Sequence, residues 1–257
     1  MSNAVVITGA ARGIGLATAI KFLAEDWQVT MLDIDGECQD KAFAALKHRK
    51  GALSIHCDVS KPGQVADAVE KTVAEFGRID TLVNNAGIAV FKPVMETTYD
   101  EWSDVMATNL SGPFICTQAC VPVMLDGGGG NIINITSISG VRASTLRVAY
   151  GTSKAALMHL TKQLAAELGN QRIRVNAVSP GPVDTAMAKQ VHTPDIRADY
   201  HDAIPLNRYG EEHELAEAIF FLSSDRASYI NGAILNVDGG FAASGIGLPS
   251  LRSEPNG

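Results

Sequence analysis

The sequence lacks several features that would place it in other classes of protein. No apolar run approaches the roughly 18 residues that a membrane-spanning helix requires, so we expect no membrane insertion. Basic residues do not gather in runs and the formal net charge is −7, which argues against nucleic-acid binding. The first apolar run begins at Ala4 and leaves no space for a signal peptide, so we expect a cytoplasmic protein.

Cysteine is also scarce, and its spacing does not match that of a metal cluster. The four cysteines are Cys38, Cys57, Cys116 and Cys120. Cys116 and Cys120 share one face of an expected helix, which leaves redox or metal chemistry open, although burial as two core thiols is the commoner arrangement. We therefore expect reduced thiols and no bound metal.

Apolar, β-prone runs alternate with helical patterns along most of the chain. Strand-like runs lie near residues 4–8, 28–32, 53–56, 81–83, 131–136, 173–178 and 233–237. Helical patterns lie near residues 14–25, 36–48, 62–76, 99–124, 150–168 and 211–222. The alternation predicts an α/β fold with a Rossmann-type, doubly wound parallel sheet flanked by helices on both faces. With 257 residues, 46% of them apolar, one domain can bury a large core.

A glycine-rich turn joins the first strand-like run to the first helical pattern. It contains Gly9, Arg12, Gly13, Ile14 and Gly15 and follows the pattern Thr-Gly-x-x-x-Gly-x-Gly. Such a turn lets the backbone approach a pyrophosphate, and the helix that follows offers free N–H groups and the positive end of its dipole. We therefore expect a dinucleotide at this turn.

Asp33 ends the second strand-like run, about 20 residues after the glycine turn, where a carboxylate can bind the 2′-hydroxyl of the adenosine ribose. The same carboxylate repels a 2′-phosphate and so favours NAD over NADP. Arg12 argues the other way, because a guanidinium beside the turn could pair with that phosphate. Since the end of a strand fixes Asp33 while Arg12 is flexible, we expect NAD.

Tyr150 and Lys154 are four residues apart and project from one face of an expected helix. An ammonium beside a phenol favours the phenolate and lowers the tyrosine pKa. A phenol with a lowered pKa could act as an acid or base near neutral pH. The spacing alone is weak evidence, because it also occurs by chance on solvated helices.

Together these motifs, in this order from Val5 to about Phe241, resemble the short-chain dehydrogenase/reductase family. The resemblance implies a catalytic tetrad of Asn109, Ser137, Tyr150 and Lys154. Besides the glycine turn, Asp33, Tyr150 and Lys154, the residues that it assigns to cofactor binding are Asp58, Val59, Asn85, Ala86, Gly87, Pro180, Gly181, Val183 and Thr185. It also implies one domain over residues 1–245, with a substrate lid near 186–206 and a tail over 246–257.

In this family, the phenol at Tyr150 exchanges a proton with an alcohol or carbonyl, and Ser137 hydrogen-bonds the reacting oxygen. Lys154 lowers the phenol pKa and binds the nicotinamide ribose. Asn109 lies in a polar break of a long helix and holds a water that links Lys154 to solvent. Hydride passes directly between substrate and nicotinamide, so the chemistry needs no metal.

Substrate contacts are expected from Ser139, Arg147 and Met187. Arg147 lies three residues before Tyr150, where a long cation could bind a carboxylate, phosphate or other polar group of a substrate. A surface arginine or an intersubunit ion pair would place the same residue there.

Three functions are consistent with these features. The first is an NAD-dependent oxidoreductase that interconverts a secondary alcohol and a ketone in a polyol, sugar or hydroxy acid. The second is a 3-oxoacyl-thioester reductase, which in this family usually uses NADPH, so Asp33 counts against it. The third is a non-catalytic dinucleotide-binding scaffold, which would not need the tetrad. The resemblance also implies a homotetramer, with a dimer as the alternative.

Overall fold

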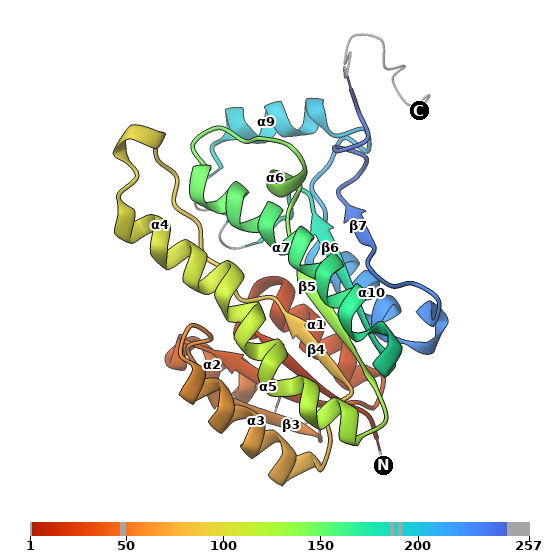
Figure 1. Cartoon of the computed structure of the whole chain (residues 1–257). Coiled ribbons are helices and arrows are strands. Elements are labelled where there is room, and N and C mark those ends of the chain that lie inside the picture. The colour runs from red at the N-terminus through yellow and green to blue at the C-terminus, as the bar shows by residue number, and fades with distance from the viewer. Residues whose placement is uncertain (1, 47–49, 186–187, 190–191, 246–257) are drawn as a thin grey trace.

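The computed structural model describes residues 2–46, 50–185, 188–189 and 192–245. Within these ranges one sheet lies between two layers of helices (Figure 1). No helix in the described ranges combines the length and apolar character needed to cross a membrane. The expected tail over 246–257 lies outside the described residues.

The sheet has seven strands, and each neighbouring pair is parallel. The strands are β1 (Ala4–Thr8), β2 (Gln28–Asp33), β3 (Ala52–His56), β4 (Thr81–Asn84), β5 (Gly130–Ile135), β6 (Ile173–Pro180) and β7 (Ile234–Val237). They lie in the order β3-β2-β1-β4-β5-β6-β7. This topology confirms the predicted doubly wound, Rossmann-type fold.

Helices cover both faces of the sheet. Those with described bounds are α1 (Gly13–Ala24), α2 (Gly36–Ala45), α3 (Pro62–Phe76), α4 (Tyr99–Met106), α5 (Gly112–Asp126), α6 (Ile138–Val141), α7 (Val148–Leu168), α9 (Pro194–Ala203) and α10 (Glu212–Ser223). Helices α1, α2 and α10 pack on one face, and α3, α5 and α7 on the other. Figure 1 shows α5 and α7 in front of the sheet, with α1 and α10 behind it.

The two faces of β1 bury different side chains. Val5 and Ile7 belong to the apolar cluster beneath α1, α2 and α10, whereas Val6 belongs to the cluster beneath α3, α5 and α7. Every residue of β1 is at most 2% exposed. A strand buried on both faces has a continuous apolar sequence, which is why the run from Ala4 to Thr8 can be recognised in the sequence.

Several helices begin at signals that the sequence carries. Pro62 starts α3, and Pro194 starts α9 just after Thr193, whose side chain accepts a hydrogen bond from the backbone of the first turn. Thr98 and Glu101 form a reciprocal capping box at the start of α4. Prolines and hydroxyl side chains suit these positions, because the first N–H groups of a helix have no partner within it.

The strand order creates an opening beside β1. The chain builds β1, β2 and β3 outward in one direction and then returns to place β4 on the other side of β1. The connections after β1 and β4 therefore leave in opposite directions, and a crevice forms where their carboxyl ends meet. The glycine turn follows β1, Asp33 ends β2 and Asn85 follows β4, so these predicted residues meet at that edge.

Asn85 ties the glycine turn to the end of β4. Its side-chain Nδ2 donates to the carbonyl oxygens of Thr8 at 3.0 Å and Gly9 at 2.9 Å. The backbone N–H groups of Asn85 and Ala86 both donate to Thr8 Oγ1 at 3.0 Å. Four hydrogen bonds thus hold the turn at a fixed position across the opening.

The long helix expected near 99–124 is interrupted. Helix α4 ends at Met106, a π-helical segment occupies Ala107–Ser111, and α5 begins at Gly112. Asn109 lies in this segment and is fully buried. The polar break seen in the sequence therefore marks a change in helical winding, which commonly accompanies functional sites.

Helix α9 lies within the segment expected to form the lid, and the sequence analysis assigned it no regular structure. None of its residues is buried. Its amphipathic signal is therefore weak, since a helix without a buried face needs no regular apolar spacing. Figure 1 shows α9 near the top of the view, close to the region where β7 ends.

Gly15→Ala should destabilise the protein and abolish dinucleotide binding. A Cβ atom at Gly15 would lie 2.1 Å from the carbonyl oxygen of Gly9 and 2.5 Å from Asn85 Nδ2, so the glycine turn must move. The matched control is Gly63→Ala, also in a helix, where an added Cβ meets nothing within 4 Å. Urea unfolding and NADH titration measure the two effects. We expect Gly63→Ala to retain binding and to gain up to about 1 kcal/mol of stability, and equal behaviour of the two variants would contradict the packing argument.

Candidate active site

A cavity of about 670 Å³ opens at the carboxyl edge of the sheet. Turns after six strands, the start of α7 and part of the segment before α10 form its walls. The predicted residues that line it are Gly9, Arg12, Gly13, Ile14, Asp33, Asp58, Val59, Asn85, Ala86, Gly87, Ser137, Arg147, Tyr150, Lys154, Pro180, Gly181, Val183 and Thr185. The structure thus brings most of the predicted site together in one cavity.

Three of the predicted residues that the structure describes are not on that wall. Gly15 packs behind the glycine turn, and Asn109 lies behind Gly87. Ser139 is buried, and its hydroxyl accepts a hydrogen bond from the Ser144 hydroxyl at 3.0 Å. Met187 lies outside the described residues.

The adenosine end of the expected dinucleotide site is acidic. Asp33 is only 7% exposed. Its carboxylate accepts hydrogen bonds from the backbone N–H groups of Ala11 at 2.9 Å and Asp35 at 3.0 Å. The guanidinium of Arg12 pairs with Asp35 at 3.2 Å. The cation expected to compete with Asp33 is therefore already beside a second carboxylate.

The segment after β3 also reaches the cavity. The Asp58 carboxylate accepts hydrogen bonds from the backbone N–H of Ser60 at 2.9 Å and from its hydroxyl at 2.7 Å. Val59 presents an apolar surface beside it. One oxygen of Asp58 thus holds the turn. The apolar surface of Val59 suits contact with a flat base.

Burial accounts for the cysteines near the site. Burial raises the pKa of the Cys57 thiol to about 11 and that of Cys120 to about 12. It also raises the pKa of Cys116 well above its usual value. A thiol with a raised pKa stays neutral and unreactive at neutral pH, so these residues serve as core side chains in this structure.

Ser137, Tyr150 and Lys154 meet at the other end of the cavity. Ser137 follows β5, and its hydroxyl accepts a hydrogen bond from the Ser139 N–H at 3.1 Å at the start of α6. Tyr150 and Lys154 lie on the first turns of α7, and the Lys154 Nζ lies 5.7 Å from the centroid of the Tyr150 ring. The arrangement places a phenol, a hydroxyl and an amine at one point of the wall.

The expected lowering of the Tyr150 pKa by Lys154 is wrong for this structure. Burial raises the phenol pKa, while the hydrogen bond with Ser137 and the charge of Arg147 act in the opposite direction. The Lys154 Nζ donates instead to the carbonyl oxygen of Ile135 at 2.7 Å. Burial also lowers the Lys154 pKa to about 8, so its charge is itself costly here.

Asn109 supports the lysine from behind the wall. Its Oδ1 accepts from the Ile88 N–H at 2.9 Å, and its Nδ2 donates to the Ile88 carbonyl oxygen at 2.9 Å and to Ser153 Oγ at 3.0 Å. A Cβ atom at Gly87 would lie 3.3 Å from Asn109 Oδ1 and 3.4 Å from Lys154 Nζ. Asn109 therefore joins the π-helical segment to Ile88 and to Ser153, the residue before Lys154.

The segment before α10 closes part of the cavity with aromatic rings. His192 and Tyr200 line the wall, and their ring centroids lie 5.3 Å apart. His192 Nδ1 lies 3.0 Å from the Tyr209 hydroxyl. Arg197 pairs with Asp184 at 2.9 Å. This network connects the expected lid to the strand β6 side of the site.

The structure adds wall residues that the sequence analysis did not select. They include Ile34, Lys61, Ile88, Phe91, Asp104 and Pro182. Ile34 directly follows Asp33 and is 61% exposed, an unusual place for a bare aliphatic side chain. Ile34 could have been selected from the sequence because it directly follows Asp33, and Phe91 because it follows Gly87 by four residues.

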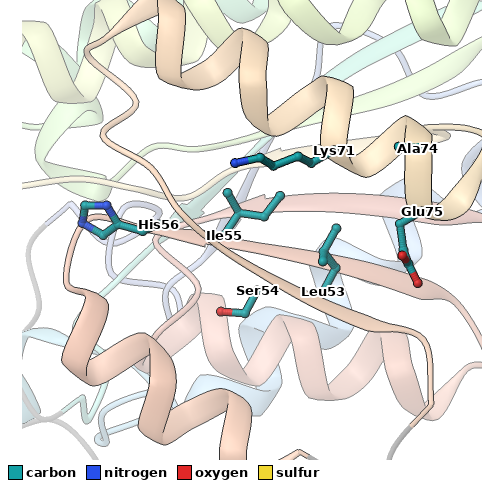
Figure 2. A pocket seen from close by; sticks show the side chains of 7 residues that line it. All are labelled: Leu53, Ser54, Ile55, His56, Lys71, Ala74 and Glu75. Carbon is teal, nitrogen blue, oxygen red and sulfur yellow. The ribbon is translucent and has the colours of Figure 1, made fainter.

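A second hollow, of about 510 Å³, lies between edge strand β3 and helix α3 (Figure 2). Its walls include His56, Lys71 and Glu75. Figure 2 shows Lys71 and Glu75 leaving α3 in different directions, and His56 donates to the Ile34 carbonyl oxygen at 2.6 Å. Polar groups do not converge here, so this hollow has no feature of a reaction site.

Lys154→Met should change how stability depends on pH. The Lys154 pKa is about 8 in the folded protein against 10.5 for the free side chain, so burial of the charge costs on the order of 3 kcal/mol below pH 8. That cost disappears as pH rises from about 8 to 10.5. The wild type should therefore gain stability over this window relative to the variant, which should lack the group that titrates.

Urea unfolding at intervals from pH 7 to 10.5 tests this, with the exposed Lys71→Met as control. The loss of a partner for the Ile135 carbonyl costs about 1–3 kcal/mol at every pH, so only the pH dependence is diagnostic. Curves for wild type and Lys154→Met that run parallel across the window would show that the amine is not desolvated.

Comparison with known proteins agrees with this geometry. A family model described as enoyl-(acyl carrier protein) reductase matches residues 9–242. The chain is 37% identical over 244 residues to a 3-oxoacyl-(acyl-carrier-protein) reductase of Staphylococcus epidermidis, covering 93% of this chain and 99% of that protein. It is 38% identical over 249 residues to the 2-(R)-hydroxypropyl-CoM dehydrogenase of Xanthobacter autotrophicus, covering 95% and 100%.

A solved structure supports the same assignment. Levodione reductase matches with a TM-score of 0.90 and 32% identity, covering 94% of this chain and 98% of that one. The chain therefore belongs to the short-chain dehydrogenase/reductase family of oxidoreductases.

Proposed function

We propose that the protein is an NAD-dependent oxidoreductase that interconverts a secondary alcohol and a ketone in a polyol, sugar or hydroxy acid. The observation that carries the proposal is the meeting of Ser137, Tyr150 and Lys154 on the wall of a cavity whose other end holds Asp33. A phenol and a hydroxyl at one point can serve one reacting oxygen, and the acidic end can bind the cofactor.

The residues of the cavity fit a nicotinamide dinucleotide. The turn from Gly9 to Gly15, held by Asn85, would hold the pyrophosphate at the N-terminus of α1. Asp33 would bind the adenosine ribose, and the segment from Pro180 to Thr185 would lie at the nicotinamide end. When bound, the dinucleotide supplies the acceptor or donor of the hydride.

Tyr150 would exchange the proton of the substrate oxygen. In oxidation the phenolate accepts the hydroxyl proton of the alcohol, and in reduction the phenol returns it to the carbonyl oxygen. Ser137 would donate a hydrogen bond to the same oxygen and stabilise the charge that develops there. Ser137 and Tyr150 line the same cavity, so both hydroxyl groups can serve one substrate oxygen.

Lys154 would bind the ribose hydroxyls at the nicotinamide end of the cofactor, as the family resemblance implies. It is 4% exposed and has a carbonyl partner at Ile135, so its position is fixed before substrate arrives. Asn109 would act through its contact with Ile88 and Ser153 as a positioning residue. These four residues are the tetrad that the family resemblance implies.

The charges around the adenosine site support NAD. Asp33 accepts two backbone hydrogen bonds, which hold its carboxylate in place. Arg12 is paired with Asp35 and would have to break that contact to reach a 2′-phosphate. Two carboxylates therefore stand where NADP brings two further negative charges.

The relatives named as 3-oxoacyl-(acyl-carrier-protein) reductases favour a second candidate, reduction of a 3-oxoacyl thioester with NADPH. It requires Arg12 to bind the 2′-phosphate in spite of Asp33. A non-catalytic scaffold is the third reading, and measurable turnover of any alcohol excludes it.

We also propose that the protein assembles as a homotetramer, with a dimer as the alternative. Helices α4, α5 and α7 would form the contacts expected from the family resemblance. Exposed apolar side chains on these helices support the proposal: Tyr99 is 80% exposed, Phe114 44% and Val148 36%. Apolar surface of this kind is typical of subunit contacts.

Tyr150→Phe should abolish turnover while leaving cofactor binding intact. The phenyl ring keeps the shape of the wall but has no proton to exchange, and loss of a general acid or base typically costs about 10²- to 10⁴-fold in rate. Steady-state oxidation of a panel of polyols, sugars and hydroxy acids measures the loss, and NADH titration provides the control. A variant with near wild-type kcat would remove Tyr150 from the mechanism.

The wild type should bind NADH more tightly than NADPH, by about tenfold or more, because charge repulsion near a buried carboxylate is worth more than 1 kcal/mol. Asp33→Ser should weaken NADH and strengthen NADPH. Asp35→Ser, which frees Arg12 while keeping Asp33, separates the two effects. Fluorescence titration of the three forms with both cofactors gives the six dissociation constants, and tighter NADPH binding by the wild type would favour oxoacyl-thioester reduction instead.

A further inference from the structure

Arg147 occupies a special position at the reacting end of the cavity. It caps the N-terminus of α7, one helical turn before Tyr150, and its side chain lines the same cavity. The first turn of α7 contains no acidic residue and no side-chain cap. The positive end of the helix dipole therefore adds to the charge of the guanidinium at this point.

No carboxylate among the described residues forms an ion pair with Arg147. Its guanidinium donates a long hydrogen bond, of 3.5 Å, to Ser139 Oγ. The guanidinium groups of two neighbouring arginines have shorter hydrogen bonds. Arg197 pairs with Asp184, and Arg142 donates to the carbonyl oxygens of Phe241 and Ser244 at 3.1 and 2.9 Å. A half-buried cation without an anion is uncommon, because desolvated charges are normally paired.

The structure also fixes the orientation of this guanidinium. It stacks on the Phe91 ring, 4.8 Å from the centroid. Leu146, directly before it, has a φ of 61°, a conformation that a side chain of this kind adopts only when its surroundings enforce it. The Leu146 carbonyl oxygen accepts a hydrogen bond from the Lys92 N–H at 3.1 Å, which joins the loop before α7 to the loop carrying Phe91.

The charge of Arg147 affects the pKa of groups on two different segments of the cavity wall. Its charge lowers the pKa of Tyr150 against the effect of burial, and it also lowers the pKa of His192, where burial is the larger cause. Phe91 and Ile138 supply apolar wall nearby. A substrate between them would meet one fixed cation beside the phenol.

We infer that the substrate carries an oxyanion, a carboxylate, sulfonate or phosphate, a short distance along its chain from the reacting carbon, and that Arg147 binds it. The planar fork of a guanidinium matches two oxygens of such a group, and the stacking on Phe91 holds that fork in place. The inference rests on the proposed function. It narrows the proposed substrates from polyols, sugars and hydroxy acids to hydroxy acids or their sulfonate and phosphate counterparts.

Arg147 could instead act on Tyr150 alone, by favouring the phenolate. That role would lower turnover of every substrate equally when the arginine is removed. A contact with the anion affects only substrates that carry one. The ratio of kcat/KM between an acid and its own methyl ester therefore separates the two roles, because the effect on the phenol cancels.

The experiment uses 3-hydroxybutyrate, 4-hydroxypentanoate and 5-hydroxyhexanoate with their methyl esters, each oxidised with NAD by the full chain. The wild type should prefer the acid over its ester by about tenfold to a hundredfold at the chain length that fits, the range expected for a charge-assisted hydrogen-bonded pair. Arg147→Gln should reduce the ratio to near one. Arg147→Lys should retain part of it, since an ammonium keeps the charge but loses the fork.

Arg226→Gln is the matched control. It removes one positive charge from an exposed residue whose guanidinium stacks on Phe221, away from the cavity, and it should keep the wild-type ratio. Circular dichroism and NADH affinity establish that each variant is folded. Equal kcat/KM for acids and esters in the wild type, which needs no variant, would overturn the inference, and so would an unchanged ratio in Arg147→Gln.

A binding measurement separates failure of this inference from failure of the proposed function. Butyrate, propane-1-sulfonate and propylphosphonate are titrated calorimetrically into the NADH complex of wild type and Arg147→Gln. Binding that weakens about tenfold or more in the variant supports the anion site even when no alcohol is oxidised. Oxidation of butan-2-ol with no anion binding would retain the proposed function and reject the site, and the order of the three affinities identifies the preferred anion.

Discussion

The hydrogen bonds between Asn85 and the end of β1 are the constraint on which the site depends. In a sheet with this strand order, the carboxyl ends of β1 and β4 diverge into an open crevice. Asn85 donates across that crevice to the Thr8 and Gly9 carbonyl oxygens. Gly15 packs against Gly9 and the Asn85 side chain. The backbone amides at the start of α1 are therefore held in one fixed position at the edge of the cavity.

The second constraint is electrostatic, and it opposes stability. Lys154 is 4% exposed, and burial lowers its pKa to about 8. Its Nζ has a carbonyl partner at Ile135 rather than a carboxylate, so the positive charge is only partly compensated. The fold thus retains a costly amine next to Tyr150, as functional sites commonly do.

The sequence predicts the fold of this protein well and the pKa shifts in its site less well. Strand runs buried on both faces, such as Ala4 to Thr8, are visible because they are continuously apolar, and the glycine turn and Asp33 are visible because strand ends fix their positions. The sign of the Tyr150 pKa shift is not visible in a spacing of four residues. It depends on how deeply the phenol is buried and on which atom the Lys154 amine contacts, and both are set by β5 and the π-helical segment around Asn109. The stacking of Phe91 on Arg147 joins residues 56 positions apart, and no local pattern encodes it.

The two ends of the cavity carry opposite charges, and this asymmetry has consequences for recognition. Asp33 and Asp35 make the adenosine end negative, and the charge of Arg12 is already committed to Asp35. At the reacting end, Arg147 and the start of α7 are positive and lack an acidic partner among the described residues. These charges would oppose a 2′-phosphate at the first end and attract an anion at the second. Because the chain as a whole has a net charge of −7, the positive end is a local feature, maintained by Leu146 and Phe91, and it stands out against a surface that repels anions elsewhere. An anionic substrate would therefore be drawn to the end of the cavity that holds the phenol, with its charge toward Arg147.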